Sequence, residues 1–342
     1  MLPEYLRRTA AYIADLQHNS GAIPWFADGI VDPWDHIEAA MGLNVAGYAD
    51  EARAAYGWLA EHQEPNGAWF AAYRNHSVVD ATRMETNFVA YVATGVWHHY
   101  LTTGDRTFLR QRWPMVEAAL EFVLDLQADT GEIYWAVDRD KGVDEDALVT
   151  GCSSIYRSLA CAQQACIALG ESATAERYRH AGERLRTALL HRPERFDRTW
   201  PSKARYSMDW FYPVLTGVTT GAAAERRIDE RWDEFVVAGL GCRCVSDEPW
   251  VTIAETCELV MALVAIGRTR HASELFENLR RFQTEDGGWW TGYVFRDEAL
   301  WPEERPTWTA GAVLLAADAL LEITPAARWF ESVSENALNS RR

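Results

Sequence analysis

Acidic and tryptophan side chains gather in six short segments that are spread along the 342-residue chain. Cleavage of a glycosidic bond needs two carboxyl groups, one protonated at neutral pH and one ionised. Several acids in one enclosed site raise the pKa of one of them, because burial and neighbouring negative charges disfavour ionisation. Tryptophan rings offer flat apolar faces that can pack against the C–H faces of a sugar. If the fold brings the segments together, they favour carbohydrate chemistry. The segments are Trp34-Asp35, 80–85, 144–146, Asp209-Trp210, 250–255 and 303–308.

Each of these residues also has a structural interpretation. A single tryptophan more often packs in a core than binds a ligand. An acid at the start of a helix, such as Asp35 or Asp209, often caps the helix or interacts with its dipole. Glu255 and Glu258 are three residues apart and share one helix face, where they bind ligand hydroxyls or pair with an arginine such as Arg83. These alternatives stay open at the level of sequence.

Amphipathic and apolar segments alternate along the chain, and the acidic segments open the apolar ones. Segment 268–283 places Leu275, Leu279 and Phe282 on one stripe, which is typical of an outer helix. Segment 252–266 is apolar after its first half, which is typical of a buried helix. We therefore predict an all-α fold, a single (α/α)6 toroid over residues 1–330 with the inner-helix N-termini at one mouth, and a frayed tail over 331–342. Outer helices are predicted at 4–17, 51–63, 105–127, 172–191, 222–237 and 268–283, and inner helices at 35–47, 84–101, 148–169, 208–216, 252–266 and 307–321.

Four outer helices end in the phrase Gln-x-x-x-Gly, beginning at Gln17, Gln63, Gln127 and Gln283. A glycine there fits the left-handed position that closes a helix. The stretches 63–69 and 283–289 also resemble the Gln-x-x-x-Gly-x-Trp repeat of terpenoid cyclases and protein prenyltransferases. However, the chain has no Asp-x-Asp-Asp tetrad and no Asp-x-Cys motif followed by a suitably placed histidine. The phrase is therefore interpreted as a structural closing device, and a cyclase or prenyltransferase is kept as an alternative function.

Composition limits the partners. The formal net charge of −17 argues against nucleic acid and anionic membrane surfaces, which select basic patches. No run of 18 apolar residues or signal-peptide h-region is present, so we expect a cytoplasmic protein that inserts into no membrane. The six cysteines are expected to be free thiols. No Cys/His/Asp set has metal-ligand spacing, so we expect no metal and no cofactor, although 140–146 offers oxygen ligands for a labile Ca²⁺.

The last apolar helix opens with Thr307-Trp308-Thr309-Ala310, directly after Glu303-Glu304-Arg305. The sixth helix opens with the serine-rich stretch 152–154, several residues after Glu145. In these features the chain resembles the six-hairpin glycoside hydrolases of the glucoamylase type, family 15. The resemblance implies that Glu145 is the general acid and that Glu304 is the general base, with Glu303 as the rival for the base.

The resemblance also implies sugar-holding roles for Asp35, the pair Arg83 and Glu85, and Arg205-Tyr206 with Asp209. The predicted function is inverting hydrolysis of a small intracellular glycan or glycosylated metabolite. The alternatives are the cyclase or prenyltransferase above, and a non-catalytic, epimerase-type or lyase-type toroid that binds a sugar. The full set expected to bind the substrate in one cavity is Asp35, Arg83, Glu85, Arg205, Tyr206, Asp209, Trp210, Trp250, Glu255, Trp289 and Trp308.

Overall fold

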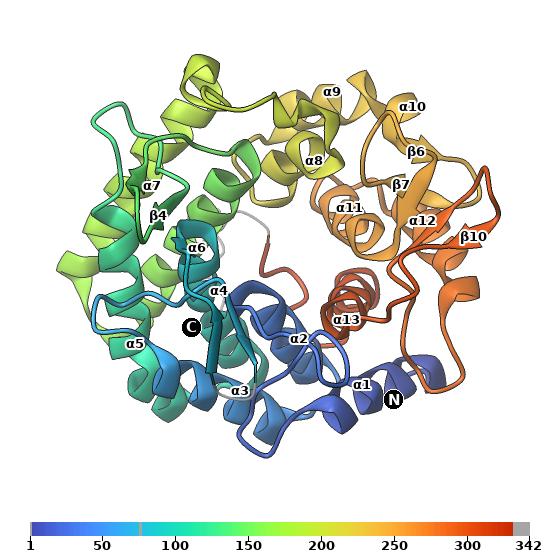
Figure 1. Ribbon diagram of the computed structural model, residues 1–342, viewed down its shortest axis with the longest axis horizontal. Coiled ribbons are helices and arrows are strands. Elements are labelled where there is room, and N and C mark those ends of the chain that lie inside the picture. Colours follow the sequence, from blue (N-terminus) through green and yellow to red (C-terminus); the bar gives the residue numbers. More distant parts are fainter. Residues whose placement is uncertain (1, 75–76, 331–342) are drawn as a thin grey trace.

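A computed structural model describes residues 2–74 and 77–330, and in it the chain forms two concentric rings of helices (Figure 1). This confirms the predicted all-α (α/α)6 toroid. The predicted tail at 331–342 lies outside the described residues. No helix in the described part is long and apolar enough to cross a membrane. The inner helices are α2 (Pro33–Val45), α4 (Thr86–Thr103), α6 (Val149–Leu169), α8 (Ser207–Leu215), α11 (Ile253–Ala265) and α13 (Thr307–Leu321). The outer helices are α1 (Glu4–Leu16), α3 (Ala49–His62), α5 (Arg106–Leu124), α7 (Ser172–His191), α9 (Gly221–Glu230) and α12 (Thr269–Leu279).

Burial distinguishes the two rings as the sequence predicted. In α12 the buried residues are Ala272, Leu275, Phe276 and Leu279, a single stripe at helical spacing. In α2 every residue except Asp35 is buried. In α11 only Glu255 and Ala265 are not buried, so a residue of α2 or α11 that stays accessible needs an explanation.

The ring closes between α2 and α13, which come from opposite ends of the chain. Gly42 and Gly311 face each other there, and a Cβ added to Gly42 would lie 2.7 Å from the Gly311 Cα. Side chains at these positions would force the helices apart, so the two glycines permit the close contact that completes the inner ring.

The Gln-x-x-x-Gly phrase joins neighbouring outer helices. Gln63 donates from Nε2 to the carbonyl of Gly67 in its own loop (2.8 Å) and to the carbonyl of Met115 in α5 (2.9 Å). Gly67 has a φ of +87°, and a Cβ there would lie 2.1 Å from the Ala118 carbonyl oxygen of the same neighbouring helix. Gln17, Gln127 and Gln283 make the equivalent pairs of hydrogen bonds to α3, α7 and α1. The interpretation as a structural closing device agrees with these contacts.

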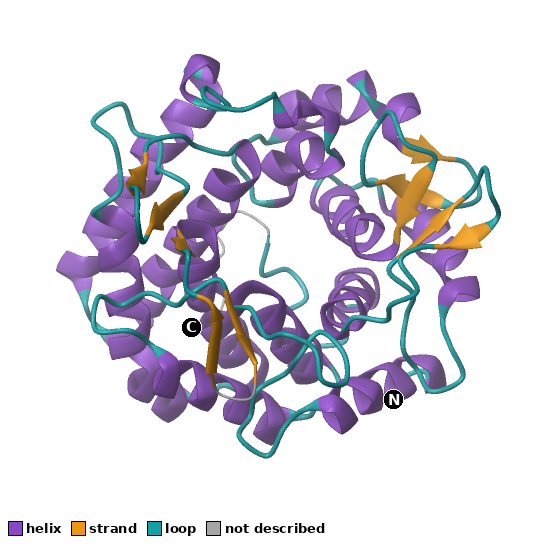
Figure 2. Cartoon of the chain, in the orientation of Figure 1, coloured by secondary structure: helices purple, strands orange, loops and turns teal. Residues whose placement is uncertain are grey.

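The structure differs from the prediction at the rim, where short antiparallel strands replace expected loops. In Figure 2 these strands lie over the helices and not between them. The expected outer helix at 222–237 likewise ends early and continues as α10 (Trp232–Phe235) and a strand. The three sheets are β1 (Ala72–Arg74) with β2 (Ser77–Asp80); β3 (Arg83–Glu85), β4 (Ala136–Asp138) and β5 (Gly142–Asp144); and, in spatial order, β10 (Ala299–Leu300), β9 (Gly292–Val294), β8 (Trp250–Thr252), β7 (Gly241–Arg243) and β6 (Val236–Val237). The short 3-10 helices are η1 (Pro193–Arg195), η2 (Lys203–Arg205) and η3 (Arg280–Phe282).

Candidate active site

A cavity of about 290 Å³ lies at the N-terminal ends of the inner helices. All six inner helices contribute to it through their first two turns, so the partial positive charges of the six helix N-termini converge on it. Four acidic side chains, Asp35, Glu38, Glu255 and Glu258, line this space. The positive ends of the helix dipoles partly offset the cost of placing these acids there. The lining residues are Trp34, Asp35, Glu38, Asn87, Phe88, Thr150, Met208, Ala254, Glu255, Glu258 and Trp308.

Two of the four carboxylates, Asp35 and Glu255, are partly accessible from the cavity. Asp35 is the third residue of α2, and Glu255 is the third residue of α11. Within these two helices only Asp35, Glu255 and Ala265 escape full burial. Two accessible acids at matching positions of otherwise buried helices make the cavity the candidate active site.

Asp35 does not cap its helix. The cap is Asp32, whose Oδ1 accepts a hydrogen bond from the Asp35 backbone N–H (3.0 Å). The alternative interpretation of Asp35 as an N-cap is therefore wrong. Burial raises the pKa of Asp35 well above its ordinary value, and the nearby negative charges of Asp32, Glu38 and Glu258 raise it further. Ionisation of Asp35 is thus disfavoured by its surroundings.

The other two carboxylates, Glu38 and Glu258, lie one helical turn deeper, and both are buried. The Tyr91 hydroxyl donates to Glu38 Oε2 (2.8 Å), and Tyr212 is hydrogen-bonded to Glu258 in the same way. Burial raises the pKa of Glu38 to about 7. It also raises the pKa of Glu258 well above its ordinary value, with the charges of Glu38 and Glu255 adding to the effect. These two acids and two tyrosines form a polar floor below the accessible pair.

Aromatic rings cover one wall of the cavity. Trp34 stacks on Tyr91 with the ring centroids 4.5 Å apart and the planes at 10°. The ring centroids of Phe88 and Trp34 are 6.1 Å apart, and the two ring planes are tilted by 57°. Trp308 lines the cavity from α13. The site therefore combines protonatable acids with apolar faces, the two features that sugar binding and glycosidic cleavage need.

The residues expected to catalyse lie outside this lining. Glu145, Glu303 and Glu304 are all exposed in the loops that lead to α6 and α13. The backbone carbonyl of Glu304 accepts from the Thr291 N–H (3.0 Å), so the loop is anchored by its main chain while its carboxylate faces solvent. The pairing of Glu145 with Glu304 or Glu303 stays a prediction.

The expected pair Arg83 and Glu85 forms an ion pair of 2.7 Å on β3, at the entry to α4. Arg83 also lies over the ring of Trp135, 5.2 Å from its centroid. Burial raises the pKa of Glu85, and the negative charge of nearby Asp32 raises it further. The pair thus borders the acidic cluster without lining the cavity.

The structure corrects the expectation that all the predicted binding residues share one cavity. Trp210 and Trp289 are fully buried, and their indole N–H groups donate to the Arg227 carbonyl (2.6 Å) and to Thr9 Oγ1 (2.9 Å), so both belong to the core. Asp209 lines a different cavity, between α8 and α9, where burial raises its pKa to about 6. A position near the predicted mouth therefore does not determine whether a side chain enters the central cavity.

Arg205, Tyr206 and Trp250 also lie outside the central cavity, and they line a second one beside it. Sequence reasoning missed Glu38, Tyr91 and Tyr212, because each lies inside an apolar helix and not in the acidic segment that opens it. A signal was available: the spacing of Asp35 and Glu38 is repeated by Glu255 and Glu258.

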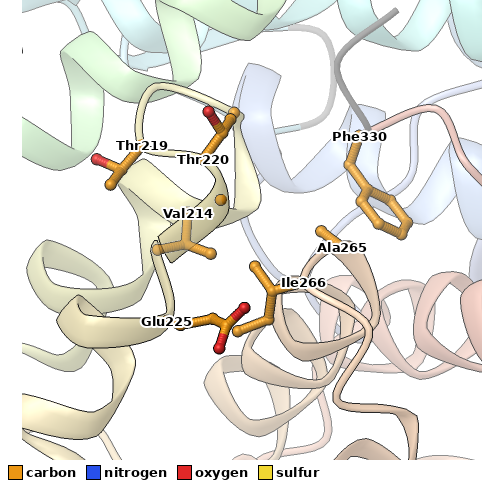
Figure 3. Close-up of a pocket in the computed structure, with 9 residues that line it drawn as sticks. Val214, Thr219, Thr220, Glu225, Ala265, Ile266 and Phe330 are labelled. Atoms are coloured by element: carbon orange, nitrogen blue, oxygen red, sulfur yellow. The ribbon is translucent and has the colours of Figure 1, made fainter. Parts of the chain in front are cut away.

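A further cavity of about 380 Å³ lies at the opposite end of the toroid, beside the C-terminal ends of α8 and α11. Figure 3 shows Glu225 close to Val214 and Ile266, with Phe330 on the other side. Among the described residues that line it, Glu225 alone carries a charge. It therefore offers no pair of acids for glycosidic cleavage. Within the described part of the chain, no three His, Cys, Asp or Glu side chains are grouped as metal ligands.

Comparison with known proteins agrees with this geometry. A family model described as the glycosyl hydrolase family 95 catalytic domain matches residues 32–167. MMP endo-(1,4)-3-O-methyl-alpha-D-mannosidase of Mycolicibacterium hassiacum is 50% identical over 333 residues, which span 97% of this chain and 90% of that protein. Among solved structures, a glycosidase in complex with glucose has a TM-score of 0.74 at 16% identity and covers 94% of this chain and 97% of that one. A bacterial glucoamylase complexed with acarbose has a TM-score of 0.69 at 11% identity, covering 96% of this chain and 56% of that one.

The fold and the comparisons define a glycoside hydrolase built on the six-hairpin toroid. The chain belongs to the family of the mannosidase from M. hassiacum. The predicted class of enzyme and the resemblance to glucoamylase-type toroids are confirmed, and the comparisons do not support the alternative of a cyclase or prenyltransferase.

Proposed function

We propose that the protein is an α-mannosidase that cleaves (1,4) linkages within chains of 3-O-methylated mannose, with inversion at the anomeric carbon. The observation that carries the chemistry is the accessible pair Asp35 and Glu255 on two walls of one acidic, aromatic cavity. The substrate class follows from the relative that is 50% identical to this chain.

Asp35 serves as the general acid. Burial and the charge of Asp32 raise its pKa, which is the direction that an acid that protonates a leaving oxygen requires. In the reaction this proton passes to the glycosidic oxygen as the bond from that oxygen to the anomeric carbon breaks. Burial and the adjacent charge of Asp32 disfavour ionisation of Asp35 most strongly, and Glu38 and Glu258 add to the effect.

Glu255 serves as the general base, which takes a proton from the water that attacks the anomeric carbon. Helices α2 and α11 both pack against α13, so one helix lies between them in the ring. An inverting pair of carboxyls stands roughly 6.5–9.5 Å apart to leave room for that water molecule, and acids on separate, non-adjacent helices suit such a gap. A directly bonded nucleophile would need a shorter separation, and we therefore favour inversion.

Glu145 with Glu304 remains the rival pair. Both side chains are exposed in loops, and neither lines the cavity. They therefore lack the enclosed environment that raises the pKa of a catalytic acid. The geometry supports Asp35 and Glu255 more strongly.

The lining also fits an O-methylated sugar. Phe88, Met208, Ala254 and Trp308 present apolar surface beside the acids. A methyl ether removes a hydroxyl donor and adds apolar area, which gains free energy when such side chains cover it. An unmethylated chain would lose this contribution, so the methylated substrate should be preferred.

We further propose that the protein acts in the cytoplasm. All six cysteines are free, and five of them are buried, as is usual in a reducing compartment. Cell fractionation with an antibody to the native protein tests this location, and recovery in the culture medium would contradict it.

The experiment for the central proposal is incubation of the enzyme with α-(1,4)-linked oligosaccharides of 3-O-methylmannose. Mass spectrometry should detect internal cleavage, and NMR spectra taken early should show the new reducing end first as the β-anomer. Release of the α-anomer first would contradict inversion. Absence of cleavage, with the unmethylated α-(1,4) chain cleaved instead, would contradict the proposed substrate.

A further inference from the structure

A second cavity, of about 450 Å³, lies beside the candidate active site at the rim of the toroid. It is formed where β8 and β9 meet the segment after η2. Its lining includes three aromatic residues, Tyr206, Trp250 and Trp301, which no step of the proposed reaction uses.

The two cavities share a wall. Cys244 lines the second cavity, and its thiol is hydrogen-bonded to Glu255, which lines the first. Trp250 begins strand β8, which runs directly into α11, where Glu255 is the third residue. This short connection places Trp250 within roughly 10–15 Å of Glu255 along the chain. A substrate chain that leaves the first cavity on this side would enter the second.

The aromatic residues are fixed in place and yet accessible. Trp301 is 56% exposed and Tyr206 is 38% exposed, so two aromatic side chains of one cavity are open to solvent. The Trp250 Nε1–H donates to the Trp301 carbonyl (2.8 Å), and the two rings stand at 73° with centroids 5.0 Å apart. Arg205 lies over the Tyr206 ring, 5.6 Å from its centroid. These contacts hold apolar faces toward solvent before any ligand is present.

The charged residues of the lining are balanced, since it contains two arginines, Arg205 and Arg296, and two acids, Glu248 and Asp297. Such a lining has no preference for an anion, which would need an excess of arginine or lysine. It offers hydrogen-bond donors and acceptors around aromatic faces, which fits a neutral sugar with both hydroxyl and methoxy groups.

We propose that this second cavity is a sugar-binding subsite, which holds the part of the O-methylated chain that extends beyond the cleaved bond. This inference rests on the proposed function. It adds a second binding site, which increases the affinity for longer oligosaccharides. The site makes the enzyme favour long chains over short ones, because only a long chain contacts Trp301 and Tyr206 while it occupies the first cavity.

The test compares the trisaccharide and the octasaccharide of α-(1,4)-linked 3-O-methylmannose. In Trp301→Ala, we expect KM for the octasaccharide to rise about tenfold, the change that loss of one stacked aromatic contact gives. The kcat and the kinetics on the trisaccharide should stay unchanged. Trp301→Phe should restore most of the loss, since it keeps an aromatic face. Leu321→Ala is the matched control, because Leu321 is also exposed (55%) but lies at the C-terminal end of α13, away from the mouth.

Binding is measured separately by calorimetry on Asp35→Asn protein. Adding Trp301→Ala to that protein should abolish the gain in affinity from trisaccharide to octasaccharide. If wild-type protein cleaves the chains and Trp301→Ala keeps the same dependence on chain length, the subsite is contradicted and the proposed function stands. If wild-type protein neither cleaves nor binds these chains, both proposals fall together.

Discussion

Asp35 and Glu255 occupy the same position, the third residue, of two inner helices that pack on either side of α13. Three residues after each of them comes a buried glutamate, Glu38 or Glu258, which is hydrogen-bonded to a tyrosine of another inner helix. The repeated hairpin thus delivers the same pair of acids twice to one cavity. In this enclosed space, burial and the neighbouring acids raise the pKa of Asp35 and of Glu258, and burial raises that of Glu38.

The first prediction concerns stability and pH. Burial raises the pKa of Glu38 from its ordinary 4.5 to about 7, so the folded protein binds more protons than the unfolded chain between these values. The contribution of Glu38 to stability is therefore fully present below pH 4.5 and is lost as pH rises through about 7. Glu38→Gln should remove this loss, up to about 3 kcal/mol. In thermal unfolding from pH 5 to pH 8, the melting temperature of the variant should increase relative to that of the wild type as pH rises. A difference in melting temperature that does not change with pH would contradict the assignment.

The second prediction concerns the hydrogen bond to that acid. Tyr91→Phe removes the donor to Glu38 Oε2 and should cost about 1–3 kcal/mol of unfolding free energy. Tyr56→Phe is the matched control, because the Tyr56 hydroxyl is buried without a hydrogen-bond partner among the described residues. It should be neutral or stabilising. Denaturant unfolding compares them, and equal losses would show that the Glu38 contact contributes nothing.

The third prediction concerns the contact between outer helices. Gly47 and Gly67 have nearly equal φ values, +86° and +87°, but a Cβ on Gly47 meets no atom within 4 Å, whereas a Cβ on Gly67 lies 2.1 Å from the Ala118 carbonyl. Gly47→Ala should cost about 1–2 kcal/mol for the left-handed backbone alone. Gly67→Ala should cost clearly more, because α3 and α5 must also separate. Similar unfolding midpoints for the two variants would argue against this role of the Gln-x-x-x-Gly phrase.

These elements show how much the sequence could predict. The ring and its closing phrase were predictable, because helical periodicity and a recurring glutamine and glycine are local patterns. The sequence could predict that the acids lie at the mouth of the toroid, but not which of them enter the cavity. Whether Asp35 or Glu145 faces the cavity depends on the rotation of a helix or the course of a loop, which the packing of distant helices decides. Trp289 illustrates the same limit, since its bond to Thr9 joins opposite ends of the chain.

The fourth prediction concerns the pH dependence of catalysis. Because Asp35 must be protonated to act as the acid, kcat/KM should fall on the alkaline side as Asp35 ionises. In Asp32→Asn the negative charge that acts most strongly on Asp35 is removed, and the pKa of Asp35 should decrease. The alkaline limb of the profile should then move to lower pH. A limb that stays in place would show that another group supplies the proton.

The assignment of the catalytic pair is tested most directly by turnover of four variants on the same methylated oligosaccharide. Asp35→Asn and Glu255→Gln should each lose roughly 10²–10⁴-fold in kcat, as removal of a general acid or base does. Glu145→Gln and Glu304→Gln, which change exposed carboxylates outside the cavity, should keep kcat within about twofold of the wild type, provided that general acid–base catalysis resides in the cavity. Near-wild-type turnover by Asp35→Asn or Glu255→Gln, with loss of turnover in Glu145→Gln and Glu304→Gln, would contradict the account and place catalysis in the rim loops.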